Sequence, residues 1–237
     1  MSKHQKALSS PKSYPIGRKE RPWTLKPRAG PHPKDDSIPL GIVVRDMLGY
    51  VDNVSEVKEV LEKGLCKVDG KVVRDHRLPL GTFDSLQLGD EYFRLMPSEE
   101  GFELVGVDEA DSGKKVCRVE DKKTVKGGKI QLNLNDGKNI VVDKKRLKKL
   151  PTGSSLVLSL PELEIEEVIE FEEGQEAMVT GGKNRGKVAE LQETKELKGS
   201  KENRVVVSSN GDELDLPEKL VFPVNEEMIK LRDNHDE

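Results

Sequence analysis

Short apolar runs separated by glycine-bearing turns dominate the middle of the chain and restrict its fold more than any other property. Within residues 91–170 the runs lie at 92–95, 102–107, 116–125, 129–134, 139–142 and 156–160. Runs of this length bounded by turn residues are typical of β-strands, and their close spacing predicts a small β-barrel. Apolar residues make up 34% and charged residues 35% of the 237 positions, which favours several small modules over one large core.

A helical pattern precedes these runs, in residues 38–90. One apolar stripe recurs at i, i+3, i+4, i+7 and i+11 and comprises Leu40, Val43, Val44, Met47 and Val51. Arg45 falls on the opposite face, where we expect solvent. Asn53 and Glu56 form a capping-box pattern that predicts the start of a second helix. An Asp-Gly pair between two β-prone runs then predicts a β-hairpin at 65–74.

Residues 1–37 have the composition of an extended basic arm. They contain six prolines, and nine Lys or Arg against three Asp or Glu. Cations for phosphate groups and rings for base stacking suit a segment that orders on RNA. The residues expected to contact RNA are Lys3, His4, Lys6, Lys12, Arg18, Lys19, Arg21, Trp23, Lys26, Arg28 and His32, with Tyr14 as a second stacking candidate. Two alternatives are a disordered solubilising tail and an arm that Trp23 anchors to its own domain.

Charge varies strongly along the chain. The net charge is −4, yet residues 1–37 carry +6 and residues 114–149 carry +9, while 38–113 and 150–177 carry −8 each. Local sign governs what a surface meets within a Debye length of about 8–10 Å. The basic cluster at 144–149 fits RNA contact and a solvated loop equally well. The acidic stretch 162–173 is expected to be an exposed strand that faces solvent or a partner.

A glycine-rich turn, Gly181–Gly186, lies between apolar positions that predict two paired strands. Glycines allow positive φ and close approach of the backbone to a partner. We expect Lys183, Asn184, Arg185 and Lys187 to meet phosphates at the rim. The alternative is an ordinary hairpin with solvated lysines. The segment resembles a KOW motif, found in ribosomal proteins and in transcription elongation factors.

Several functions lack any sequence signal. No run is long enough to span a membrane, and the first residues have no apolar signal-peptide core. The two cysteines, Cys66 and Cys117, show no Cys-x-x-Cys spacing and no adjacent histidine, which favours buried reduced thiols in a cytoplasmic protein over the alternative, a disulfide between them. The four histidines form no metal-ligand spacing, and His76 beside Asp75 suggests a surface pair rather than a catalytic base. We therefore expect no enzyme, no metal and no cofactor.

The order of modules resembles ribosomal protein S4e, a small-subunit family of archaea and eukaryotes. The matching strings are Lys3-His4, 10–15, 30–32, 37–40, 67–72, Arg74-Asp75, 81–84, Glu164-Ile165 and 181–186. The resemblance implies an α+β protein of several modules: an arm (1–37), a small α/β S4-type RNA-binding module (38–90), a central small β-barrel (91–170) and an SH3-like KOW β-barrel with an acidic tail (171–237). In the S4-type module Arg45, Lys71 and Arg74 match RNA-contacting positions, and Arg77 is a weaker candidate.

The resemblance also implies a function. Such a protein would be a structural constituent of the 30S subunit in the cytoplasm, binding 16S ribosomal RNA beside neighbouring small-subunit proteins, with no small-molecule substrate. If about six to eight phosphates are neutralised, RNA affinity should fall steeply with salt, and deleting residues 1–37 should flatten that dependence. Two alternatives remain open: a KOW-bearing transcription elongation factor, and an RNA-modifying enzyme that carries an S4-type module.

Overall fold

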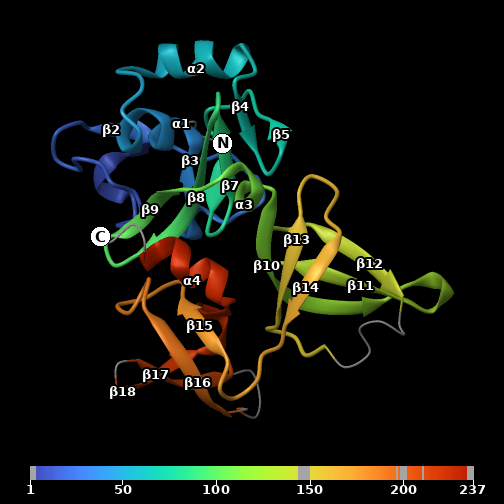
Figure 1. The fold of residues 1–237 in the computed structure, drawn as a ribbon. Helices are drawn as coiled ribbons and strands as arrows, with labels where there is room; N and C mark the ends of the chain where they lie inside the picture. The colour runs from blue at the N-terminus through green and yellow to red at the C-terminus, as the bar shows by residue number, and fades with distance from the viewer. Residues whose placement is uncertain (1–3, 144–149, 196, 198–201, 210, 234–237) are drawn as a thin grey trace. The chain divides into compact units, whose positions relative to one another are not determined.

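The computed structural model describes residues 4–143, 150–195, 197, 202–209 and 211–233. The predicted contacts at Lys3, the side chain of His4 and the basic cluster 144–149 lie outside this description. The chain forms two compact units, Met1–Gly113 and Lys114–Glu237 (Figure 1). Helices and antiparallel sheets occur together, so the expected α+β class is confirmed.

The first unit contains three antiparallel sheets with the orders β1-β2, β3-β6 and β5-β4-β7-β8-β9. Its strands are β1 His4–Lys6, β2 Trp23–Leu25, β3 Ser37–Pro39, β4 Cys66–Val68, β5 Lys71–Val72, β6 Pro79–Gly81, β7 Ser85–Leu88, β8 Glu91–Ser98 and β9 Gly101–Gly106. Its helices are α1 Leu40–Ile42, which continues as a π-helical turn Val43–Met47, then α2 Val54–Glu62 and α3 Glu109–Ser112, with 3₁₀ turns at Ala7–Ser9 and Lys34–Asp36.

Local signals in the first unit give the predicted elements. The Asn53 side chain accepts hydrogen bonds from the backbone N–H groups of Ser55 and Glu56 at 2.9 and 3.0 Å, which caps α2. The expected hairpin is formed by β4 and β5, with positive φ at Asp69 and Gly70 as a tight primed turn requires. The predicted stripe from Leu40 to Val51 packs into the core of the unit.

The expected extended arm is wrong, because residues 4–36 are folded into the first unit. Tyr14 is buried in the main core, and Ile16 and Leu25 pack against it. Gly101 explains how the segment fits so closely: a Cβ there would lie 2.5 Å from the carbonyl oxygen of Ser13, and the φ of Gly101 is 141°. A burial this complete also removes Tyr14 as a stacking candidate.

A second correction concerns the expected central barrel. Its first two predicted strands exist, as β8 and β9, but β8 pairs with β7 of the first unit. The predicted boundary near residue 90 therefore falls inside a continuous sheet, whereas the two compact units meet at 113–114. Strand periodicity predicts strands but not their partners, and the short Gly89–Asp90 turn makes β7 and β8 a hairpin.

The second unit contains two five-stranded antiparallel sheets with the orders β12-β11-β10-β13-β14 and β18-β17-β16-β15-β19. The strands of the first sheet are β10 Lys114–Thr124, β11 Lys129–Leu134, β12 Asn139–Asp143, β13 Ser155–Ser159 and β14 Ile165–Ile169. Those of the second are β15 Glu176–Val179, β16 Val188–Lys195, β17 Arg204–Ser209, β18 Asp212–Pro217 and β19 Val221–Pro223, followed by α4 Glu226–Asp233.

Each sheet of the second unit has its own apolar cluster. Cys117, Leu132 and Leu156 belong to the cluster of the first sheet, and Leu191 and Val205 to that of the second. The paired strands predicted around the Gly181–Gly186 turn are β15 and β16, which pair in register from 176 to 178. The acidic stretch forms the edge strand β14, as expected.

Candidate nucleic-acid interface

The exposed cations of the first unit gather partly around the β1–β2 sheet. Lys6 and Trp23 are directly opposite each other in the register, so their side chains share one face. Both are exposed, Trp23 to 56%, and Arg21 two residues earlier is exposed as well. We call Lys6, Arg21 and Trp23 the β1–β2 surface. An aromatic ring flanked by cations suits a nucleotide, whose base stacks while its phosphate is neutralised.

Arg18 was predicted to contact RNA, but its guanidinium is used inside the fold. Its Nη2 donates to the carbonyl oxygens of Leu8, at 3.0 Å, and of Ser10. These bonds satisfy backbone acceptors around the 3₁₀ turn Ala7–Ser9, which otherwise lack partners. The other predicted cations on this segment, Lys12 and Lys19, are exposed.

His32 and Arg45 are also engaged within the first unit. The His32 Nε2 lies 3.1 and 3.0 Å from the two carboxylate oxygens of Asp84, and both side chains are buried. Arg45 was expected on a solvent face, but its side chain is 14% exposed and is bidentate to Asp46, at 3.0 and 2.7 Å. The Arg45 guanidinium is already paired and partly buried, and the His32 ring is buried against Asp84, so we assign both residues a structural role.

A second group of basic residues is linked to Asp75, directly or through Arg77. Arg28 Nη1 lies 3.0 Å from the Asp75 carboxylate, and Arg77 Nε donates to the carbonyl oxygen of Lys26 at 3.0 Å. The backbone N–H of Arg28 also donates to the carbonyl oxygen of Arg77. We call Lys26, Arg28, Asp75 and Arg77 the Asp75 cluster. The cluster holds three basic residues and one carboxylate, and Arg74, next to Asp75 in the sequence, is exposed.

His76 adjoins this cluster but adds no charge at neutral pH. Burial lowers its pKa below the usual histidine value, Asp75 opposes this, and the cations Lys58 and Arg77 lower it further. The imidazole is therefore neutral where the neighbouring cations are charged. On the β4–β5 hairpin, Lys71 is exposed.

A lysine-rich hairpin in the second unit was not singled out from the sequence. The turn between β10 and β11 extends past the last register pair of β12 (Figure 1). Three lysines surround this turn: Lys123, Lys126 and Lys129. All three are exposed and have no ion pair among the described residues. Gly127 and Gly128 at the tip both have positive φ. We call the three lysines the lysine hairpin; its sequence signal was a Gly-Gly turn flanked by lysines between two predicted strands.

Other cations of the same basic block are structural. Lys115 is buried, and its Nζ lies 3.1 Å from the Asp136 carboxylate, which Lys138 also approaches to 3.1 Å. Burial alone would raise the pKa of Asp136, but the two ammonium groups and a backbone hydrogen bond from Lys138 bring it below its usual value. The carboxylate is therefore ionised and neutralises part of the block.

Arg118 makes several contacts within the second unit. Its Nη1 donates to the carbonyl oxygens of Lys219, at 2.6 Å, and Val221, at 3.2 Å. Its Nε and Nη2 donate to Oε1 of Glu120 at 3.0 and 2.5 Å, and the guanidinium lies 5.8 Å from the ring centroid of Phe222. Through its bonds to the carbonyl oxygens of Lys219 and Val221, Arg118 holds strand β10 to the segment around β19.

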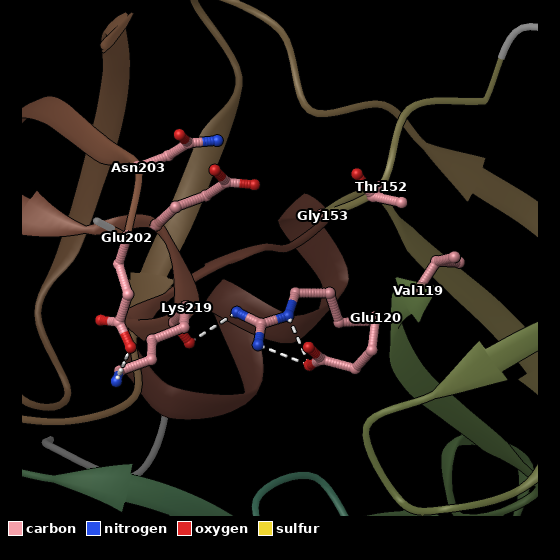
Figure 2. Close-up of a pocket in the computed structure, with 9 residues that line it drawn as sticks. Val119, Glu120, Thr152, Gly153, Glu202, Asn203 and Lys219 are labelled. Atoms are coloured by element: carbon pink, nitrogen blue, oxygen red, sulfur yellow. Dashed lines mark hydrogen bonds and ion pairs between the residues drawn. The ribbon is translucent and has the colours of Figure 1, made fainter. Parts of the chain in front are cut away.

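A pocket of about 240 Å³ opens beside Arg118 and is lined by Glu120, Glu202 and Glu218 (Figure 2). Lys219 also lines it, and its Nζ is paired with Glu202 at 2.5 Å. Three carboxylates around a saturated guanidinium repel a phosphate group, so this pocket does not belong to an RNA-binding surface.

The Gly181–Gly186 turn has the conformation that its glycines suggested. Gly182 and Gly186 have φ of 80° and 82°, and the Gly186 N–H donates to the carbonyl oxygen of Val179 at 2.7 Å. Lys183 is exposed, whereas Asn184, Arg185 and Lys187 are half-buried. Lys183 therefore is the most accessible cation of the turn.

No group of three or more potential metal ligands occurs among the described residues, and none of the described helices is long and apolar enough to cross a membrane. Cys66 and Cys117 are both buried free thiols. Burial raises the pKa of Cys66 to about 12, which keeps this thiol protonated and unreactive.

The chain is similar to known proteins along nearly its whole length. Ribosomal family S4e matches residues 89–165, and the RS4NT (NUC023) domain matches residues 1–35. The small ribosomal subunit protein eS4 of Ignicoccus hospitalis is 38% identical over 241 aligned residues, which cover 97% of this chain and 94% of that protein. The eS4 protein of Methanococcus aeolicus is 42% identical over 197 residues, covering 80% of each chain. The crystal structure of the 30S ribosomal protein S4e from Thermoplasma acidophilum aligns with a TM-score of 0.70 at 26% identity, covering 81% of this chain and 96% of that one.

Proposed function

Because the chain belongs to the archaeal ribosomal S4e family, we propose that it is a structural constituent of the small ribosomal subunit that binds 16S ribosomal RNA. The observation that carries this proposal is the similarity to a small ribosomal subunit protein across 97% of the chain. The protein would work in the cytoplasm as part of the ribosome, beside neighbouring proteins of the subunit.

RNA binding would depend mainly on phosphate contacts from separate exposed groups. In the first unit these are the β1–β2 surface, the Asp75 cluster and the exposed Lys12, Lys19, Lys71 and Arg74. In the second unit they are the lysine hairpin and the Gly181–Gly186 turn with Lys183, Asn184, Arg185 and Lys187. Cations spaced over a folded surface fix the position of a protein on RNA without reading its sequence.

Trp23 would add a different kind of contact. Its ring is 56% exposed beside Lys6, although Trp is among the residues that folding usually covers. Stacking of an unpaired base on such a ring contributes about 1–3 kcal/mol. The cations hold the backbone of the nucleotide while the ring receives its base.

The acidic net charge of −4 is compatible with this function. Part of the acidic charge lies on β14, away in sequence from the lysine hairpin and from the Gly181–Gly186 turn. Because salt screens charges beyond about 8–10 Å, an RNA helix meets the local charge of each surface rather than the net charge.

The two alternatives receive no support from the similarities. The relatives named above are small-subunit proteins over most of their own length, which leaves no separate catalytic or polymerase-binding region to account for. The proposal assigns the chain no reaction, cofactor or small-molecule substrate.

Sedimentation of a cell lysate through a sucrose gradient tests the proposal. The protein should co-sediment with the small subunit and remain bound after a wash in moderate salt. Purified full-length protein should also bind protein-free 16S ribosomal RNA, with an affinity that falls steeply as salt rises. Sedimentation with RNA polymerase, or only as free protein, would refute the proposal.

A further inference from the structure

The first sheet of the second unit has two free edges that border a common groove. The strand order β12-β11-β10-β13-β14 leaves β12 and β14 each paired on one side. A groove of about 680 Å³ is lined by residues of both edges. Its apolar lining comprises Ile140, Val142, Leu163, Ile165 and Val168, all half-buried against the core of this sheet.

Free edges present unpaired backbone groups. In an antiparallel pair, alternate residues point their N–H and C=O groups away from the partner strand, and these groups can pair with an additional strand. Proteins usually block such edges or use them to bind an extended peptide. Here Val141 on β12 remains 53% exposed beside the groove.

Acidic side chains define the charge of this groove. Three carboxylates line it together with the apolar residues: Glu164 and Glu166 on the β14 side and Asp143 on the β12 side. Among the described cations, Lys114 approaches Glu166, but at 3.9 Å and with both side chains about 40% exposed, which gives little neutralisation. The groove therefore combines an apolar floor with a negative rim.

We propose that this groove binds an extended basic peptide of another protein, which adds a strand at the free edge. Alternate apolar side chains of the peptide would contact the floor, and its Lys or Arg residues would pair with the carboxylates of the rim. The inference goes beyond RNA binding and rests on the proposed function in one respect: the peptide would come from a neighbouring protein of the particle.

The charge of the rim distinguishes this occupant from two others. RNA would bring phosphates against Glu164 and Glu166, which is unfavourable. A second copy of this chain that paired β14 with β14 would place the same carboxylates opposite each other, and like charges directly opposite destabilise a sheet. A basic strand meets neither penalty.

A fluorescence-anisotropy titration of the full-length protein tests the proposal. The probe is a fluorescein-labelled peptide of about seven residues that alternates lysine and valine, long enough to span a five-residue edge strand. We expect saturable binding, with amides in 139–143 and 165–169 gaining protection from hydrogen exchange. A lysine–serine peptide of equal charge and a glutamate–valine peptide should each bind at least about tenfold more weakly.

Two matched variants test the rim. The double substitution Glu164→Gln and Glu166→Gln should weaken peptide binding about tenfold, because it removes two of the three carboxylates that line the groove. The control Glu170→Gln and Glu172→Gln makes the same change in net charge at exposed positions outside the lining and should stay within about twofold. Circular dichroism should show both variants folded.

Several results would overturn the inference. These are no saturable binding, equal binding of the lysine–serine peptide, equal effects of the two double variants, or exchange protection outside the two edges. Self-association of the free protein that protects the same amides would assign the groove to a second copy. RNA affinity is measured on the same samples: if it persists while peptide binding is absent, this inference alone fails, and if wild-type RNA binding is absent, the proposed function fails.

Discussion

The lysine hairpin offers the sharpest test of how RNA affinity arises in this protein. The perturbation is the triple substitution Lys123→Ala, Lys126→Ala and Lys129→Ala. All three side chains are exposed and carry no ion pair among the described residues, so their loss should change the free energy of unfolding by less than about 0.5 kcal/mol. Any change in RNA affinity then reports contact rather than folding.

The expected magnitude follows from counterion release. Each neutralised phosphate contributes about 0.7–0.9 to the slope of log K against log salt concentration. If each lysine of the hairpin meets one phosphate, the slope should flatten by about 2.1–2.7. At about 0.1 M salt this corresponds to a loss of about 130- to 500-fold in affinity, or about 3–3.7 kcal/mol.

The assay is a filter-binding titration against protein-free 16S ribosomal RNA at several salt concentrations between about 50 and 400 mM. A matched control replaces three exposed lysines of the same unit that already have carboxylate partners: Lys195, Lys219 and Lys230, paired with Glu193, Glu202 and Glu226. The control removes the same formal charge. It should change the slope by less than about 1, because paired lysines release fewer counterions.

Equal slopes for wild-type protein and the hairpin variant would refute this reasoning, since the lysines would then touch no phosphate. Equal flattening by the hairpin variant and the control would also refute it, because total charge rather than position would govern binding. A loss of affinity at unchanged slope would point to a contact other than an ion pair.

Three further outcomes are expected. Trp23→Ala should lower RNA affinity about 5- to 100-fold, whereas Trp23→Phe should retain most of it, because tryptophan and phenylalanine rings both stack on a base. Anisotropy titrations measure this, and a Trp23→Phe variant that binds no better than Trp23→Ala would exclude stacking. Arg118→Met should lower the free energy of unfolding by about 2–4 kcal/mol in urea titrations, because two carbonyl oxygens and a carboxylate lose their donor, and a change below about 0.5 kcal/mol would contradict that role. An NMR titration should give the Asp136 carboxyl a pKa below the usual aspartate value, and a raised value would disprove the ionised state. Because the pKa is lowered in the folded protein, the stability that this carboxylate provides is present at neutral pH and is lost as the pH falls through that pKa.

Much of the local structure followed from the sequence because it depends on local rules. The capped start of α2 at Asn53, the Asp69–Gly70 hairpin and the strands beside Gly181–Gly186 need few distant partners. Alternation and turn residues determine such elements within a few positions. The α+β class follows from their sum.

Long-range partners could not be predicted in this way. The proline-rich first segment has no apolar periodicity, yet single residues such as Tyr14 reach the core from irregular backbone. Arg18 looks like an RNA ligand in the sequence, but its guanidinium donates to carbonyl groups whose positions depend on the tertiary fold. The lysine hairpin was not singled out because its exposure depends on where β10 and β11 end relative to β12.

The folded first segment changes how truncation should be interpreted. Deleting residues 1–37 removes Tyr14 and Ile16 from the core of the first unit, so a loss of RNA binding would report unfolding as well as lost contacts. Point substitutions at exposed positions such as Lys6 and Arg21 avoid this ambiguity.

The contact between Ser13 and Gly101 also bears on the order of events during synthesis. Translation delivers the N-terminal segment first, but its docking site includes a strand, β9, that is made last in this unit apart from α3. Until Gly101 leaves the ribosome, the side chains of Tyr14 and Ile16 have no completed core to enter. A basic and partly apolar segment thus waits in an unfolded state beside a translating ribosome rich in RNA, and early folding of the unit from its N-terminus is not available to this chain.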